Sequence, residues 1–320
     1  MREEMLRYIA KRLLWLPFFL LIVSFIVFTV GRFGPGDPAL LIAGPQASTE
    51  TIERIRHNMG LDQPILVQYL AYMARFIRGD LGESMVYIGQ PVSKLLAERM
   101  VISGSIVLIA LAISLVVGIG TGLVASFKKG TRTESAILGV FLFFGSIPSL
   151  ILVQFAILVF SFWLHILPAK WSGSWESVFT LQIVIPVFVL WVSSVSDIAR
   201  YVRATTLKEL DENYVRFAKA KGLPNRVIAM RYVLRNALLP LVTLIIPAIF
   251  GAISGSFFIE FLYGIPGTGQ FMVTALFQRD YPVITGFIII LAVLSMIANL
   301  LQDITYAIVD PRAQVTKRSF

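Results

Sequence analysis

Six long apolar runs without a charged residue constrain the fold of this 320-residue chain more than any other feature. A bilayer core about 30 Å thick is crossed by about 20 helical residues. The runs are 13–30, 101–127, 136–164, 181–196, 237–259 and 283–301. We therefore predict an all-α integral membrane protein with six transmembrane helices.

The composition agrees with this prediction and excludes several chemistries. Hydrophobic residues make up 57% of the chain and charged residues 15%, whereas soluble domains carry about 25% charged residues. The chain has no cysteine and two histidines, which excludes disulfides, thiolate catalysis and cysteine- or histidine-rich metal sites. We expect no catalytic residue, no metal and no cofactor.

The basic residues indicate the orientation in the membrane. The net charge is +9, and the positive charges gather in segments 128–132 and 200–235 and near both termini. By the positive-inside rule these segments and both termini are cytoplasmic, so the charge does not indicate nucleic-acid binding. The first run follows four basic residues like a signal peptide, but it is too long and no small-residue cleavage site follows, so we interpret it as a retained signal anchor.

The segment 31–100 is too long for a simple connection, and the topology places it outside. It begins with a Pro/Gly turn over 34–41. Two short helices follow, one starting after Ser48 and one closed by Gly79. Two interpretations stay open: a surface loop that packs on the helices, or a platform for a soluble delivery protein.

The segment 197–236 carries the most information about function. Apolar residues at three- and four-residue steps predict one amphipathic helix through Leu207, Leu210, Tyr214, Phe217 and Ala218. Gly222 ends that helix, because glycine adopts the left-handed conformation without strain. Leu223 and Pro224 break the chain, and a second helix over 226–235 returns to the membrane.

Two interpretations of this basic segment remain. It is an anchor on anionic lipid, or a rigid projection that enters a groove on another protein. The helix, glycine and Leu-Pro sequence favours the second. The candidate docking residues are Tyr214, Arg216, Phe217, Ala218, Ala220, Lys221, Gly222 and Leu223.

Ordered motifs along the whole chain carry a family resemblance. They are GDPALL, MGLDQPILVQY, GDLGESM, YVRFAKAKGL, FLYGIPGTGQ, RDYP and NLLQDITYAIVDPR. With them the chain resembles the B-type permease subunit of dipeptide and oligopeptide ABC importers, among the type I importer permeases. The resemblance implies an N-terminal transmembrane helix with an extracytoplasmic helical loop (1–96), a MetI-like five-helix permease core (97–310) and a cytoplasmic tail (311–320).

The family's "EAA" motif, which contacts the ATPase, falls on Arg216, Phe217 and Ala218, with its glycine at Gly222. Only Ala218 and Gly222 match the pattern. The closing Leu-Pro, Leu239 and Pro240, lies further from the glycine than in sugar-type permeases. The resemblance still implies that this loop docks an ATPase.

The resemblance also implies partners and a location. A homologous second permease subunit would complete the pore as a heterodimer, with two cytoplasmic ATP-binding subunits and an extracytoplasmic substrate-binding protein, in the lipid of a prokaryotic inner membrane. Transport would follow alternating access. The implied cargo is di- or oligopeptides; nickel complexes, glutathione and oligosaccharides are alternatives.

Motifs for chemistry within the chain are absent. The sequence GIPGTGQ (264–270) lacks the Lys-Ser/Thr of a phosphate-binding loop, and we interpret it as a structural turn. The chain is therefore not expected to hydrolyse ATP. An ion-coupled secondary transporter is the second hypothesis, but such a protein needs ionisable residues near the membrane midplane. Glu260, Asp197 and Asp303 lie only at the ends of the apolar runs.

Overall fold

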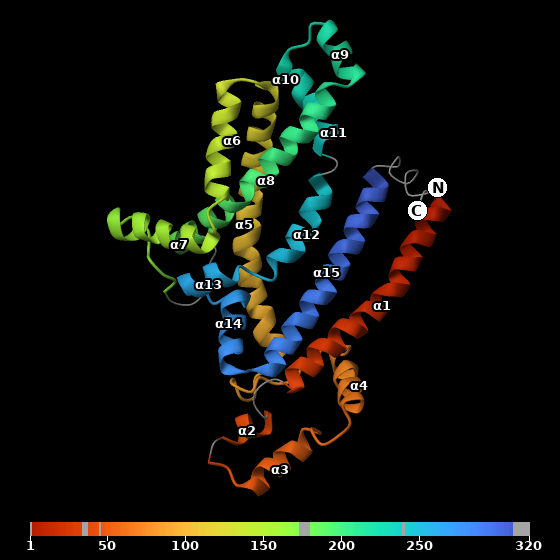
Figure 1. Ribbon diagram of the computed structural model, residues 1–320, viewed down its shortest axis with the longest axis vertical. Coiled ribbons are helices and arrows are strands. Elements are labelled where there is room, and N and C mark those ends of the chain that lie inside the picture. Colours follow the sequence, from red (N-terminus) through yellow and green to blue (C-terminus); the bar gives the residue numbers. More distant parts are fainter. Residues whose placement is uncertain (1, 34–37, 45, 173–179, 239–240, 310–320) are drawn as a thin grey trace. The chain divides into compact units, whose positions relative to one another are not determined.

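The computed structural model describes residues 2–33, 38–44, 46–172, 180–238 and 241–309 (Figure 1). Within these ranges the regular structure is helical, and one isolated β-bridge joins Glu83 to Pro91. The predicted all-α class is confirmed. The first part of the 34–41 turn, the pair at 239–240 and the tail at 311–320 lie outside the described residues.

The chain divides into two compact units. The first comprises Met1–Ile102 and Pro266–Ile297, and the second comprises Ser103–Ile265 and Ala298–Phe320. The boundaries fall within two long helices, α5 (Val92–Phe127) and α15 (Tyr281–Val309). The domain limits at 97 and 311 stay predictions.

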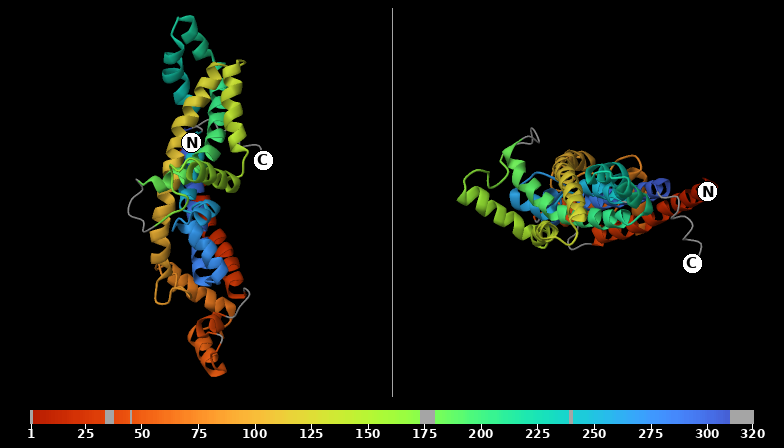
Figure 2. Two further views of the ribbon diagram at one scale, coloured as in Figure 1. Left: turned by 90° about the vertical axis from the view of Figure 1, so that its left-hand side faces the viewer. Right: turned by 90° about the horizontal axis from the view of Figure 1, so that it is seen from above.

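The first unit holds the N-terminal helix and the helices of the long loop. Besides parts of α5 and α15, its helices are α1 (Arg2–Phe33), α2 (Pro38–Ala43), α3 (Thr49–Asn58), α4 (Ile65–Phe76) and α14 (Thr268–Gln278). Helix α4 lies against α1, which Figure 2 shows from two further directions.

Local cap chemistry positions the two predicted loop helices. Ser48 accepts a hydrogen bond from the Thr51 backbone N–H at 3.2 Å, which caps α3. Beyond α4, Gly79 has φ +80° and the Asp80 N–H bonds to the Arg75 carbonyl at 3.1 Å. Both predicted helices are confirmed. Helix α2 was not predicted, because only a turn was expected there.

The second unit holds the remaining helices. They are α6 (Arg132–Gly145), α7 (Ser149–Ile157), the π-helix η1 (Leu158–Trp163), the 3-10 turn η2 (Leu181–Ile183), α8 (Val184–Leu210), α9 (Asn213–Ala220), α10 (Asn225–Val227), the π-helix η3 (Ile228–Val233), α11 (Leu234–Leu238), α12 (Val242–Ala252) and α13 (Phe257–Tyr263). Helix α8 packs against α6, α7 and α11.

Among the described residues, four helices are long and apolar enough to cross a membrane: Leu14–Phe33, Val92–Phe127, Leu181–Leu210 and Tyr281–Thr305. Two further candidates are bent pairs, α6 with α7–η1 at 93° and α12 with α13 at 41°. The run 136–164 is thus not one straight helix: Pro148, which cannot donate a backbone hydrogen bond, stands directly before α7. The count reaches six only if each bent pair is one span, so six spans remain a prediction.

Small residues on α5 let the backbone of α8 approach closely. A Cβ added at Gly122 would lie 2.7 Å from the Ala199 carbonyl oxygen, and one at Gly118 would lie 2.7 Å from Ile198. One turn before Gly118, the Ser114 hydroxyl donates to the Trp191 carbonyl of α8 at 3.3 Å. One turn after Gly122, the Ser126 hydroxyl donates to the Arg203 carbonyl of α8 at 3.4 Å. This close contact is of the small-xxx-small kind found between membrane helices.

Candidate functional site

The basic segment 197–236 is built on the end of α8. Helix α8 runs unbroken from the fourth apolar run to Leu210 and ends at Asp211, and α9 begins after Glu212. The predicted single helix from Leu207 to Ala218 is therefore wrong. An acidic pair before Asn213 favours a helix start, because carboxylates stabilise the positive N-terminal end of a helix.

One face of α9 is buried in a small apolar cluster. Val215 is 0% exposed and Ala218 is 3% exposed. The other buried members of this cluster are Ile228, Val233 and Ala237, and its partly buried members include Leu210 and Leu223. Sequence reasoning missed Val215, although its three-residue step to Ala218 is the signal that marks this face.

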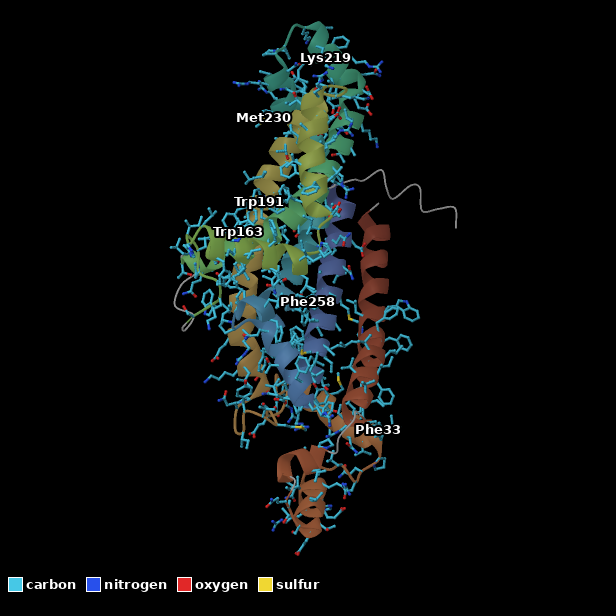
Figure 3. All side chains as sticks on the ribbon, turned by 60° about the vertical axis from the view of Figure 1, so that its left-hand side comes forward. Phe33, Trp163, Trp191, Lys219, Met230 and Phe258 are labelled. Carbon is cyan, nitrogen blue, oxygen red and sulfur yellow. The ribbon has the colours of Figure 1, made fainter. Side chains whose placement is uncertain are left out.

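The opposite face of α9 is exposed and combines an aromatic ring with positive charge. Phe217 is 71% exposed, and Arg216, Lys219, Ala220 and Lys221 are exposed beside it in sequence. Lys219 and the 65% exposed Met230 mark this part of the chain in Figure 3. Such a surface suits an apolar groove with acidic edges.

The turn after α9 has the geometry of a Schellman cap. Gly222 has φ +76°. Its N–H bonds to the Lys219 carbonyl at 2.9 Å, and the Leu223 N–H bonds to the Ala218 carbonyl at 3.3 Å. A Cβ at Gly222 would meet no atom within 4 Å, so the backbone conformation, not lack of space, requires glycine here.

Tyr214 ties the segment together instead of projecting from it. Its hydroxyl donates to the Glu209 carboxylate on α8 and accepts a hydrogen bond from the Asn236 side chain on α11 at 3.0 Å. Burial and the Glu209 hydrogen bond raise the pKa of Tyr214, so the hydroxyl remains a donor at neutral pH. The three side chains fix α9 between α8 and α11.

A partly buried ion pair between Glu134 and Arg203 fixes the base of the segment. The Arg203 Nε donates to Glu134 Oε1 at 2.6 Å, and the Gly130 backbone N–H donates to the other oxygen at 2.6 Å. Thr131 caps α6 by accepting from the Glu134 N–H at 3.4 Å. Sequence reasoning missed this pair, although Thr131 and Glu134 have the spacing of a capping box.

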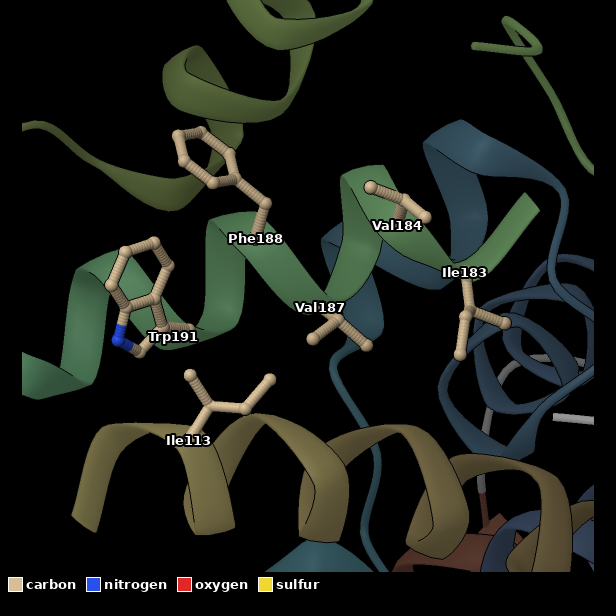
Figure 4. Close-up of a pocket in the computed structure, with 6 residues that line it drawn as sticks. All are labelled: Ile113, Ile183, Val184, Val187, Phe188 and Trp191. Atoms are coloured by element: carbon tan, nitrogen blue, oxygen red, sulfur yellow. The ribbon is translucent and has the colours of Figure 1, made fainter. Parts of the chain in front are cut away.

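Elsewhere in the described residues, an apolar groove is the main concave feature. A groove of about 340 Å³ between α5 and α8 is lined by Ile113, Ile183, Val184, Val187, Phe188 and Trp191 (Figure 4). No group of three or more His, Cys, Asp or Glu that could hold a metal occurs among the described residues. What the basic segment offers in its described residues is an exposed aromatic and cationic face on a packed support.

Two protein families match the sequence. Residues 114–315 match the family described as binding-protein-dependent transport system inner membrane component. Residues 5–116 match the N-terminal family of binding-protein-dependent transport system membrane components. The first match covers more than half of the chain and includes the whole basic segment.

Curated relatives match over nearly their full length. A Brucella abortus protein named as a peptide transport system permease protein is 35% identical over 298 residues, 92% of this chain and 95% of that protein. The oligopeptide transport system permease protein OppB of Haemophilus influenzae is 32% identical, over 96% and 99% of the two chains. The glutathione transport system permease protein GsiC of Shigella flexneri is 33% identical, over 96% and 98%.

Proposed function

This chain belongs to the binding-protein-dependent transport system inner membrane component family, and from that premise we propose that its basic segment docks the ATP-binding subunits of an importer. Members are multi-pass permease subunits of ABC transporters, and ATPase activity resides in separate subunits. A permease therefore needs a contact surface that receives the ATPase movement.

The exposed face of α9 supports the docking proposal. Phe217 is 71% exposed although it is a large aromatic residue, and it stands on a helix held by the Val215 cluster, the Tyr214 hydrogen bonds and the Gly222 cap. A rigid support reduces the entropy lost on binding. Such a projection suits the helix-in-groove mode of recognition.

In the proposed assembly this chain pairs with a homologous second permease subunit, and the pore lies between them. Two cytoplasmic ATP-binding subunits contact the basic segments, and an extracytoplasmic binding protein delivers the substrate. Both termini face the cytoplasm of a prokaryotic inner membrane, as the positive-inside rule favours. ATP binding opens the pore outward, and hydrolysis returns it inward by rigid-body movement.

The proposed cargo is short peptides. The names of relatives at 32 and 35% identity support it, since they refer to oligopeptide and peptide transport. A relative at 33% identity named for glutathione transport makes a peptide-like thiol the second candidate. Uptake by the assembled importer, measured separately with labelled oligopeptides and with labelled glutathione, distinguishes the two.

Substitution of Gly222 tests the docking proposal. Gly222→Val places a β-branched residue at φ +76°, a left-handed conformation that costs roughly 1–2 kcal/mol for residues with a Cβ. We expect the variant to insert normally but to lose uptake while ATP hydrolysis continues. Gly222→Asn is the matched control, since asparagine tolerates this conformation, and it should keep most of the uptake. Normal uptake by Gly222→Val would refute docking through this cap.

Uptake assays with the purified chain test the alternative that it is an ion-coupled secondary transporter. If the purified chain alone accumulated substrate in liposomes under an ion gradient, the ATPase-dependent proposal would be wrong. We expect uptake only when ATP-binding subunits and ATP are present.

A further inference from the structure

Helix α4 has apolar side chains on both of its faces. Its inner face buries Tyr69, Tyr72 and Met73. Its outer face exposes aliphatic side chains; Leu66 is 60%, Val67 47% and Leu70 64% exposed, and Ile77 just beyond the helix is 79% exposed. Exposed aliphatic side chains that lie together in this way mark a contact with lipid or with another protein. Something apolar therefore covers the outer face.

The inner face of α4 contacts the middle of α1. The Tyr69 hydroxyl bonds to Ser24 at 2.8 Å and to the Leu21 carbonyl at 3.0 Å. Aromatic rings fill the rest of the contact, with Phe25 5.1 Å from Tyr69 and Phe28 5.2 Å from Tyr72 between ring centroids. Both helices belong to the first unit, so this contact is intrinsic to it.

This contact sets the depth of α4. Ser24 lies near the middle of the candidate span Leu14–Phe33, about 14 Å from either end at about 1.5 Å per residue. A helix that touches α1 there lies beside the hydrocarbon region. Five large apolar side chains on this part of α1 are also exposed, as expected of a surface that faces lipid: Phe18, Phe19, Leu21, Ile22 and Ile26.

Unpartnered polar groups lie at one end of this contact. The Arg32 guanidinium lies 5.5 Å from the centroid of the Phe28 ring, which also packs against Tyr72. Arg32 Nε and the Tyr72 hydroxyl are buried without a hydrogen-bond partner in the described part of the chain. Arg75 lies close enough to Arg32 for the two cations to repel. An anion placed beside these groups would relieve the repulsion.

We propose that α4 and the end of α1 form a phospholipid-binding site. The acyl chains cover Leu66, Leu70 and Ile77, and an anionic headgroup phosphate binds Arg32 and Arg75. Arginine suits this role, because its planar fork of donors matches phosphate oxygens. The site lies in the leaflet at the C-terminal end of α1, so it is independent of the docking proposal.

The neighbouring helix α3 shows what a water-facing helix of this chain looks like. It has no buried residue. Its Arg56 pairs with Glu53 at 2.6 Å, and His57 just before its end contacts Asp62 at 2.7 Å. The outer face of α4 has no such pairs. The contrast favours lipid over water, and the two arginines favour a phospholipid over an apolar protein surface.

Fluorescence quenching tests the acyl part in the whole complex. Because the chain has no cysteine, single labels are introduced by Leu70→Cys, by Phe19→Cys as the lipid reference and by Arg54→Cys as the water reference. In nanodiscs with brominated phosphatidylglycerol, we expect residue 70 to be quenched as strongly as residue 19, and residue 54 to be quenched by aqueous iodide instead. Iodide quenching at residue 70 would overturn the proposal in favour of water, and protection from both quenchers would overturn it in favour of a protein partner.

The headgroup part is tested with the same label. In the Leu70→Cys background, brominated phosphatidylglycerol should quench several-fold more effectively than brominated phosphatidylcholine at equal mole fraction. The double change Arg32→Gln with Arg75→Gln should reduce this preference to parity, whereas Arg56→Gln on α3 should leave it unchanged. Equal quenching by both lipids before any arginine is changed, or a preference that survives the double change, would overturn the anionic site.

Discussion

At the scale of single residues, Val215 and Phe217 give α9 two different faces. Val215 is fully buried in the cluster that holds the helix, while Phe217 is 71% exposed. The two positions are separated by one residue, so the same short helix supplies both the anchor and the contact surface. Their substitutions should therefore affect different properties of the protein.

Phe217→Ala should weaken ATPase attachment without weakening the fold. Substitution of a side chain that is 71% exposed changes the free energy of unfolding by less than about 0.5 kcal/mol. We expect an unchanged thermal unfolding temperature but lower co-purification of the ATP-binding subunits. Val215→Ala, the control, should cost about 1.5–3 kcal/mol because its side chain is fully buried. Full ATPase attachment in Phe217→Ala would favour the lipid-anchor interpretation.

At the scale of elements, the contact between α5 and α8 depends on missing side chains. Gly118 and Gly122 face α8, and each leaves room for backbone or side-chain atoms of that helix. Gly120 lies between them on another face, with open space around it. Substitutions at these glycines can therefore distinguish the effect of close packing against α8 from the intrinsic effect of glycine on helix stability.

Gly122→Ala should destabilise the second unit, because its Cβ would lie 2.7 Å from the Ala199 carbonyl oxygen and 2.9 Å from Val202 Cβ. Overpacking of this kind costs about 1–3 kcal/mol. Gly120→Ala is the control; it should be neutral or stabilise the helix by roughly 0.5–1 kcal/mol. Thermal unfolding in detergent measures the stability of both variants. Equal melting temperatures would show that close contact between α5 and α8 does not limit stability.

The sequence predicted those elements whose chemistry is local. Ser48 and Gly79 bound their helices as expected, and Gly222 ends α9 with positive φ, because cap residues act on their own turn. The break after Asp211 and the burial of Val215 were missed. In a helix as short as Asn213–Ala220, sequence spacing allows more than one choice of buried face, and tertiary packing decides between them.

Long-range features could not be predicted from one sequence. The run 136–164 was expected as one span, and its 93° bend depends on what packs against α7. The Glu134–Arg203 pair joins residues far apart in the chain, and Tyr214 bonds to Asn236 across the basic segment. Such contacts exist only after the helices have packed.

At the scale of the whole molecule, charge asymmetry predicts the orientation in the membrane. Single cysteines in this cysteine-free chain test it directly. Lys129→Cys should react with an impermeant maleimide only in inverted vesicles, and Glu50→Cys only in intact cells or right-side-out vesicles. Both side chains are exposed, so access is decided by topology. Labelling of Glu50→Cys from the cytoplasmic side alone would contradict the positive-inside assignment.

The unbroken course of α8 has a mechanical consequence. With 27 residues, the helix is about 40 Å long at about 1.5 Å per residue. A tilt of about 5° about one end would displace the other by roughly 3–4 Å over that length. The helix is continuous over this length, from Val184 to Leu210, so a push delivered near Leu210 would act along the whole of it. A movement of the Leu210 end would therefore tilt the whole helix. The tilt would also reorient the Val184 end, which lies beside the apolar groove.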